Sequence, residues 1–175
     1  MLDKYKYTDK EQKELLASMK LLIDTREQKG DHIINWLDQK KIAYKKQKLN
    51  QGDYSFYVPK NPVLNIDRDL HFDNEICIER KNSIDELIGN FASDRTRIES
   101  EFLRHKGKMI LLIEDSSYGD IINGNYRSKY SIQSAIGTLH AFSARYNIPF
   151  IFIDSKYSGH FIYYTLSYYL REIIK

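Results

Sequence analysis

The most constraining feature of the sequence is a short apolar run that ends in charged residues. Residues 76–81 read Ile-Cys-Ile-Glu-Arg-Lys, with the period-two alternation of a β-strand. Successive side chains of a strand point to opposite faces, which predicts Glu79 and Lys81 on one face and Arg80 on the other. A carboxylate and an ammonium group are then held about 7 Å apart along a stiff backbone.

The strand is followed at once by a helix signal. Ser83, with Glu86 three residues later, has the spacing of a capping box, and Asp85 falls in the first turn, where the helix dipole favours an anion. A carboxylate beside a lysine at such a junction suits metal-dependent phosphodiester hydrolysis. A second carboxylate has to come from another strand, and Asp53, directly after Gly52, is the candidate.

Composition and charge restrict the class of protein. The chain of 175 residues is 42% hydrophobic and 29% charged, which indicates one globular domain with a substantial core. A net charge of +3 permits a nucleic-acid partner without requiring one. The single cysteine, Cys77, excludes an internal disulfide and fits a reducing compartment. Without an apolar run of about 18 residues or a signal peptide, we expect a cytoplasmic protein with no membrane partner.

The hydrophobic pattern predicts an α/β structure with a mixed sheet flanked by helices. Strands are expected at 21–23, 42–49, 53–58, 76–79, 109–113 and 150–153, and helices at 8–19, 32–41, 94–105, 131–146, after Ser83 and after Gly159. We expect residues 49–52 to close a hairpin between the second and third strands. Residues 60–74 are expected to form a long exposed hairpin loop and 116–130 a second long loop. Residues 1–19 are expected to be a frayed tail and short helix, and 20–175 the main domain.

Three acidic residues stand at the tips of predicted strands. Asp24 follows the apolar run 21–23, Asp53 precedes the third strand, and Glu79 lies near the end of the fourth. In a mixed sheet these tips can gather at one edge, where carboxylates would hold a divalent cation.

Two ordered motifs resemble those of the XPF-type nucleases, within the restriction-endonuclease-like superfamily. The family signature is Gly-Asp, a variable gap, Glu-Arg-Lys, three residues and Asp. The chain has Gly52-Asp53, then Glu79-Arg80-Lys81, then Asp85, with an upstream Asp24-Thr25-Arg26-Glu27 and a downstream Leu111-Leu112-Ile113-Glu114. An arginine of the following helix is matched by Arg95. The resemblance covers roughly residue 20 to the end and is closest to compact bacterial and phage single-domain members.

The resemblance implies a restriction-endonuclease-like three-layer core and a role for each matched residue. Asp53 and Glu79, with Asp24, are expected to hold the metal, and Lys81 to contact the scissile phosphate or position the attacking water. The implied metal is Mg²⁺, with Mn²⁺ as a substitute, and no small-molecule cofactor is implied. The implied catalytic residues are Asp24, Asp53, Glu79, Arg80 and Lys81, with Arg26, Glu27 and Asp85 in support.

The expected partner is DNA, branched or otherwise structured. Arg95 and Arg97 of the predicted helix 94–105, and Arg127 and Lys129 of the loop 116–130, are the candidates for DNA contacts. The family resemblance and an aromatic closing helix also predict a homodimer. The alternative function is a catalytically inactive nuclease fold that serves as a DNA-binding subunit or scaffold.

Each candidate also has a purely structural interpretation. Glu79 and Lys81 can be an ordinary surface ion pair, Asp53 a turn residue after Gly52, and Asp85 a stabiliser of the helix start. A stretch without acidic residues, 40–48, holds five lysines and is either a phosphate-contact surface or a solvated face.

Overall fold

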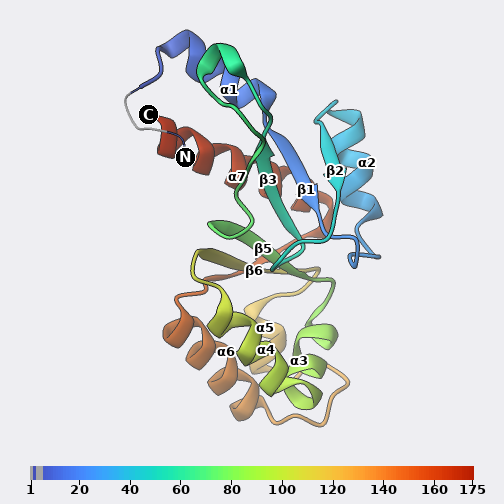
Figure 1. Ribbon diagram of the computed structural model, residues 1–175. Helices are drawn as coiled ribbons and strands as arrows, with labels where there is room; N and C mark the ends of the chain where they lie inside the picture. Colours follow the sequence, from blue (N-terminus) through green and yellow to red (C-terminus); the bar gives the residue numbers. More distant parts are fainter. Residues whose placement is uncertain (1, 3–5) are drawn as a thin grey trace.

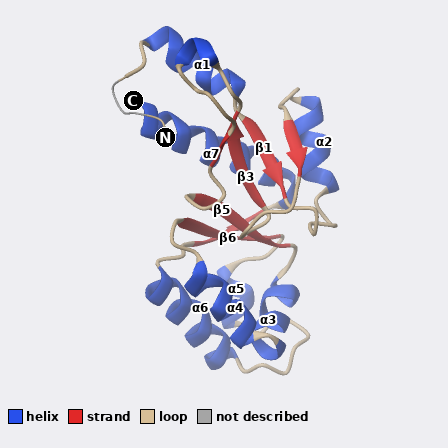
Figure 2. Ribbon diagram, in the orientation of Figure 1, coloured by secondary structure: helices blue, strands red, loops and turns tan. Residues whose placement is uncertain are grey.

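The fold is an α/β structure with helices on both faces of one mixed sheet (Figure 1, Figure 2). The computed structural model describes residue 2 and residues 6–175, so most of the predicted tail 1–7 lies outside the described residues. The strands are β1 (Lys20–Ile23), β2 (Tyr44–Lys46), β3 (Tyr54–Val58), β4 (Leu70–His71), β5 (Ile76–Lys81), β6 (Lys108–Glu114) and β7 (Phe150–Ile153). The helices are α1 (Asp9–Ser18), α2 (Asp31–Gln39), α3 (Ile84–Ser93), α4 (Arg95–Arg104), α5 (Tyr118–Ile122), α6 (Ile132–Tyr146) and α7 (Ser158–Ile174).

The sheet has the order β2-β1-β3-β5-β6-β7, with β4 paired to β3. Strands β5, β6 and β7 run parallel, and β3 is antiparallel to both β1 and β5. Only one register pair, Tyr54 with Ile78, joins β3 to β5. The sheet therefore changes from antiparallel to parallel at the point where the candidate carboxylates lie.

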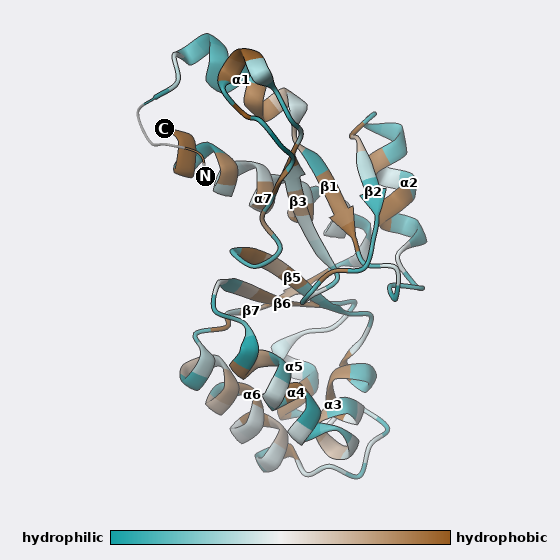
Figure 3. Cartoon of the chain, viewed as in Figure 1, coloured by the Kyte–Doolittle hydropathy of each residue, from teal (hydrophilic) through white to brown (hydrophobic). Residues whose placement is uncertain are grey.

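Two apolar clusters cover the two faces of the sheet. Helices α1, α2 and α7 pack on one face, where Leu15, Leu37 and Leu166 are fully buried. Helices α3, α4, α5 and α6 pack on the other face, where Phe91 and Phe142 are buried. Figure 1 shows these helix groups on opposite sides of β5 and β6, and Figure 3 shows apolar residues along β1 and on parts of α1 and α2. Three layers result, as predicted.

The N-terminal helix α1 belongs to the same core as the rest of the chain. Thr8 and Glu11 form the predicted capping box, since the Thr8 side chain accepts from Glu11 N and the Glu11 carboxylate accepts from Thr8 N. Leu15 of α1 is buried in the cluster that contains α7. The predicted boundary between residues 19 and 20 therefore does not coincide with a break in the apolar core.

The predicted hairpin between the second and third strands is wrong. Strand β2 pairs in parallel with β1, and β1 lies between β2 and β3. Residues 47–53 instead cross from one side of β1 to the other. The β2 strand is also only three residues long and lies at the edge of the sheet, where Lys45 and Lys46 are exposed.

Both long predicted loops contain regular structure. Within 60–74 lie a 3-10 turn (Pro62–Leu64) and β4, and the side chains of Leu64, Ile66 and Phe72 are buried. Within 116–130 lies α5, whose N-terminus is capped by Ser117. The sequence pattern did not predict these short elements, because the segments are mostly polar and only a few of their residues are apolar and buried.

Candidate active site

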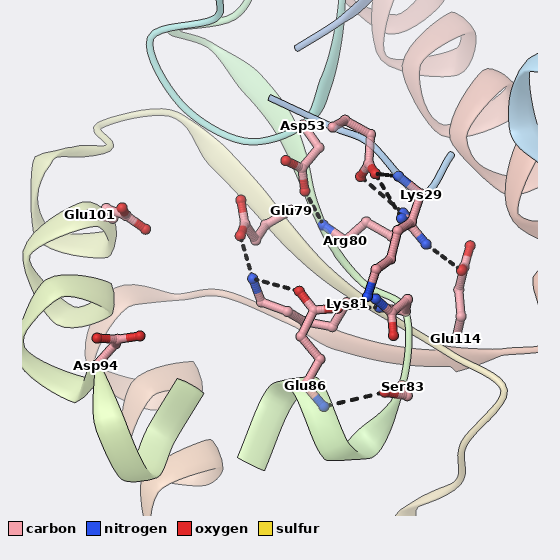
Figure 4. Close-up of polar contacts among 12 residues, drawn as sticks. Lys29, Asp53, Glu79, Arg80, Lys81, Ser83, Glu86, Asp94, Glu101 and Glu114 are labelled. Atoms are coloured by element: carbon pink, nitrogen blue, oxygen red, sulfur yellow. Dashed lines mark hydrogen bonds and ion pairs between the residues drawn. The ribbon is translucent and has the colours of Figure 1, made fainter. Parts of the chain in front are cut away.

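The two faces of β5 carry different chemistry, as the alternation predicted. Ile76 and Ile78 pack in the cluster with α7, and Cys77 packs in the cluster with α3 and α4. Glu79 and Lys81 follow Cys77 onto the second face, where Lys81 Nζ donates to Glu79 Oε1 at 2.7 Å (Figure 4).

Asp53 is brought to Glu79 by a turn that requires glycine. Gly52 has a φ of +68°, and a Cβ at this position would lie 2.8 Å from the Cys77 Cβ, so both conformation and space exclude a side chain. The turn is held by Asp53 N donating to Ile78 O at 2.9 Å. The Asp53 carboxylate accepts from Arg80 N at 2.8 Å, which orients it beside the β5 strand (Figure 4).

The carboxylates of Asp53 and Glu79 interact strongly. Burial and the neighbouring charge of Glu79 raise the pKa of Asp53 well above its usual value. Burial opposes the charge of Lys81, but attraction to Glu79 outweighs it and raises the pKa of Lys81. The pocket therefore holds two crowded carboxylates beside a lysine that stays protonated at neutral pH.

A cavity of about 230 Å³ opens in front of this pair. Asn50, Gln51 and Gly52 line one side of the cavity together with Asp53 and Glu79. Helix α4 supplies the other side through Arg97, Glu101, Phe102 and Arg104, and Figure 4 shows Glu101 on α4 across from Glu79. We call this space the catalytic cavity.

Asp24 is held by hydrogen bonds to Arg26 and to the backbone of Leu49. Its side chain is buried, and its two oxygens accept from Arg26 N, Arg26 Nε, Arg26 Nη2 and Leu49 N at 2.7–2.9 Å. Burial opposes the charge, but these bonds outweigh it and lower the pKa of Asp24. Asp24 thus fixes Arg26 at the rim of the catalytic cavity and anchors the chain at Leu49. Its predicted role as a metal ligand stays a prediction.

Arg80 lies in a buried ion network on the opposite face. Its Nη2 and Nε donate to the two oxygens of Glu27, and its Nη1 donates to Glu114 Oε2 at 2.5 Å. Glu114 also lies 2.8 Å from His32 Nε2. Burial works against the charge of Arg80, but the two carboxylates raise its pKa further above the usual value. The Arg80 side chain is therefore held by this network, and Arg80 also lines a second cavity with Asp53, Glu79 and Lys81. Its predicted catalytic role stays a prediction.

Comparison with known proteins places this geometry in a family. A model of the ERCC4 domain matches residues 23–165, which is most of the chain and includes Asp24, Asp53 and Glu79.

The chain belongs to the ERCC4 domain family.

Solved structures of this family share the fold. XPF from Aeropyrum pernix is 17% identical, with a TM-score of 0.63 over 88% of this chain and 66% of that chain. XPF from Aeropyrum pernix in complex with DNA is 16% identical, with a TM-score of 0.61 over 87% and 65% of the two chains. The chain thus spans just under two thirds of each XPF chain. A search of curated proteins finds no match. The predicted resemblance to the XPF-type nucleases and the predicted fold class are confirmed.

The final aspartate of the ERCC4 motif lies apart from the carboxylate pair. Asp85, at the start of α3, accepts from Arg127 N and Arg127 Nε at 2.7 and 2.8 Å. Within the same turn, Ser83 accepts from Glu86 N as predicted, but the Glu86 carboxylate accepts from Asn82 N instead of closing the capping box. Glu86 is turned toward Lys81, whose Nζ is 4.0 Å away.

The arginines and lysine predicted to contact DNA occupy different surfaces. Arg97 lines the catalytic cavity and pairs with Glu101 at 2.9 Å. Arg95 lies against the Phe142 ring of α6, 5.6 Å from its centroid. Arg127 is bound to Asp85, and Lys129 is exposed on the same loop. Only Arg97 of these four is close to the carboxylates, and DNA contact by the others stays a prediction.

Sequence reasoning missed several residues of the site. The sequence resemblance includes Glu114 at the end of a matched strand but implies no role for it, and no motif includes His32. Glu101 and Gln51 were not singled out. For Glu114, the sequence signal of a site residue was a charged side chain at the end of a buried strand. For Glu101, only its spacing of four residues from Arg97 could have indicated that both lie on one face of the helix.

Proposed function

We propose that the chain is a metal-dependent DNA endonuclease that hydrolyses phosphodiester bonds. The observation that carries the proposal is the convergence of Asp53, directly before β3, with Glu79 and Lys81 of the adjacent strand β5, at one cavity of about 210 Å³ that adjoins the catalytic cavity. The setting of these residues in an ERCC4 domain supports the assignment.

The residues at the cavity fit a hard divalent cation. Asp53 and Glu79 present carboxylate oxygens. Burial and the neighbouring charge of Glu79 raise the pKa of Asp53, and a bound cation would offset this cost of ionising it. Mg²⁺ is commonly bound through one or two carboxylates with waters completing its shell. The described residues contain no group of three or more His, Cys, Asp or Glu side chains placed to hold a metal, so the proposed ion would be held through Asp53 and Glu79.

The bound metal would supply an activated water and would polarise the scissile phosphate. The chain's own residues prepare the rest. The Arg80 N–H keeps one Asp53 oxygen oriented, and Glu79 keeps Lys81 protonated through the raised pKa of that lysine. Lys81 Nζ is then available to donate to a phosphate oxygen as negative charge develops in the transition state.

The expected substrate is DNA, the ligand of the solved XPF complex, and the resemblance to the XPF-type nucleases favours structured or branched DNA. A cleavage panel of duplex, single strand, flap, fork and Holliday junction, each with Mg²⁺, with Mn²⁺ or with a chelator, tests this directly. Cleavage of at least one DNA with either metal, and of none with the chelator, is the expected result. Intact DNA in every lane would refute the proposal.

An inactive DNA-binding subunit remains the second candidate. The observation in its favour is that Lys81 already neutralises Glu79, with Nζ and Oε1 at 2.7 Å. A metal titration separates the two functions, because a scaffold binds branched DNA without cutting it at any metal concentration.

A homodimer is also proposed, on the basis of α7. Its inward residues Ile162, Leu166 and Leu170 are buried, whereas Tyr164 and Tyr168 on the outer face are 44% and 53% exposed. These rings contact one another and His160 in one aromatic row. Sedimentation should show a dimer that Tyr164→Ser and Tyr168→Ser together dissociate; a monomer at high concentration would contradict it.

Among the described helices, none is both long and apolar enough to span a bilayer.

A further inference from the structure

Lys81 lies between two carboxylates at unequal distances (Figure 4). Its Nζ donates to Glu79 Oε1 at 2.7 Å and lies 4.0 Å from Glu86 Oε1. The first contact is a hydrogen bond, and the second is too long to be one. All three side chains line the same cavity of about 210 Å³. Glu86 is therefore a second carboxylate within reach of the ammonium group.

The proposed function gives Glu79 two competing partners. Glu79 is a proposed metal ligand, and it is also the hydrogen-bonded partner of Lys81. A divalent cation and an ammonium group at one carboxylate repel each other. Lys81 cannot simply turn to solvent, because its side chain is only 13% exposed and a buried charge without a partner is costly. Metal binding at Glu79 therefore requires another partner for Lys81.

The other carboxylates near Lys81 already have partners. Asp53 is the second proposed metal ligand and accepts from Arg80 N. Glu27 accepts from the Arg80 guanidinium through both of its oxygens. Among the residues that the structure describes, the ion pairs of Glu86 consist of the 4.0 Å contact with Lys81 alone. Glu86 is therefore the carboxylate best placed to receive the lysine.

The start of α3 holds Glu86 in this position. Glu86 Oε2 accepts from Asn82 N at 3.0 Å, and Glu86 N donates to Ser83 Oγ at 3.2 Å. With Oε2 bound to the backbone, Oε1 is the oxygen that faces Lys81. The bond to Asn82, which replaces the expected closure of the capping box, thus fixes a carboxylate oxygen beside the lysine.

We propose that Glu86 is a positioning residue, which binds Lys81 in place of Glu79 when Glu79 binds a divalent cation. A movement of Nζ by roughly 1 Å brings the 4.0 Å contact to hydrogen-bond distance, and the flexible stem of lysine permits it. Glu79 is then free for the cation, while Lys81 stays in the cavity with donors left for a phosphate. This inference rests on the proposed metal-dependent function and deepens it. Glu86 itself lies outside the motif that ends at Asp85.

Calorimetric titration of the whole protein with Mg²⁺ or Mn²⁺, without DNA, tests this role. Glu86→Gln should bind either ion ~10-fold more weakly than the wild type, as is typical when a group that supports a metal ligand is lost, because Lys81 then stays on Glu79. The glutamine oxygen still accepts from Asn82 N, so the start of α3 is preserved. Glu172→Gln removes an exposed carboxylate from α7 and, as the matched control, should bind like the wild type.

A second background separates this role from direct attraction between Glu86 and the ion. In Lys81→Ala, Glu79 has no competing ammonium group, so metal binding should be tighter than in the wild type. Adding Glu86→Gln to this background should not weaken binding further. A merely structural Glu86 would not give a change in metal affinity that depends on Lys81. Equal weakening with and without Lys81, or no weakening in Glu86→Gln alone, would overturn the inference.

Urea unfolding in chelator tests the same pairing without metal. Glu86→Gln should lower the midpoint little in the wild type, where Lys81 keeps Glu79, and further in the Glu79→Gln background, where Glu86 is the remaining partner. Equal shifts in both backgrounds would contradict the role of Glu86 even if the wild type binds metal and cuts DNA. A wild type that binds neither ion would instead refute the metal-dependent function, and the inference with it.

Discussion

The two faces of β5 differ in how completely their charges are paired. On the α2 and α7 side, the Arg80 side chain is only 3% exposed and contacts the carboxylates of both Glu27 and Glu114. On the α3 and α4 side, Glu79 and Lys81 face a cavity and remain 19% and 13% exposed. Consecutive residues of one strand thus serve a closed ion network and an open, charge-crowded site.

This difference separates the residues that stabilise the fold from those proposed to take part in the reaction. A buried ion pair that is fully satisfied contributes little over an apolar replacement, but leaving one partner unpaired is costly. Crowded carboxylates such as Asp53 and Glu79 do not stabilise the fold, and they hold negative charge where a cation can bind. Substitutions on the open face should therefore affect activity, and substitutions on the closed face should affect the free energy of unfolding.

The largest effect is expected on the open face. Asp53→Asn and Lys81→Ala should each lower the cleavage rate by about 10³-fold, because they remove a metal ligand and a transition-state donor. Thermal unfolding should show that both variants stay folded. Asp67→Asn, an exposed aspartate of the 60–74 segment, is the matched control. Wild-type rates in both site variants would show that these residues are not catalytic.

On the closed face, Arg80→Met should cost about 3–5 kcal/mol of unfolding free energy, since it leaves two buried carboxylates without their partner. Urea denaturation measures the loss. Combining it with Glu27→Leu and Glu114→Leu should recover much of the stability, because an apolar triad needs no compensating charge. If Arg80→Met alone leaves stability unchanged, the network is not a structural element.

A smaller effect concerns pH. Burial opposes the charge of Glu27, but the bonds and charge of Arg80 outweigh it and lower the pKa of Glu27 below its ordinary 4.5. A carboxyl group with a lowered folded-state pKa contributes stability that is complete above the unfolded value and lost as pH falls through the folded value. Unfolding free energy should thus decline below about pH 4.5, and Glu27→Gln should have a flatter profile there. An identical acid slope in the variant would contradict the assignment.

The smallest effect on stability is expected at Asp85. Its ion pair with Arg127 is exposed, and such pairs add little to global stability. Asp85→Asn should leave the urea midpoint unchanged while amide hydrogen exchange of residues 125–130 becomes faster, because the loop loses its attachment to α3. A drop in the urea midpoint would show that Asp85, like the ion network around Arg80, stabilises the fold.

The sequence predicted what local periodicity determines. The alternation through β5 placed Glu79 and Arg80 on opposite faces, and the glycine before Asp53 marked the turn that brings it to Glu79. Strand partners depend on distant segments, so the position of β2 outside β1 could not be read from residues 49–52. Likewise, the contact between Glu114 and His32 joins residues 82 positions apart, which no spacing rule reveals.

Arg80 takes part in both the closed ion network and the open site, through its side chain and its main chain respectively. Its guanidinium is locked into the buried network, while its main-chain N–H orients the Asp53 carboxylate. The ion network therefore holds in place the peptide group whose N–H orients the Asp53 carboxylate. Loss of function on replacing Arg80 would therefore include misalignment of Asp53 transmitted along the backbone, beside any direct loss at the cavity that Arg80 lines with Lys81.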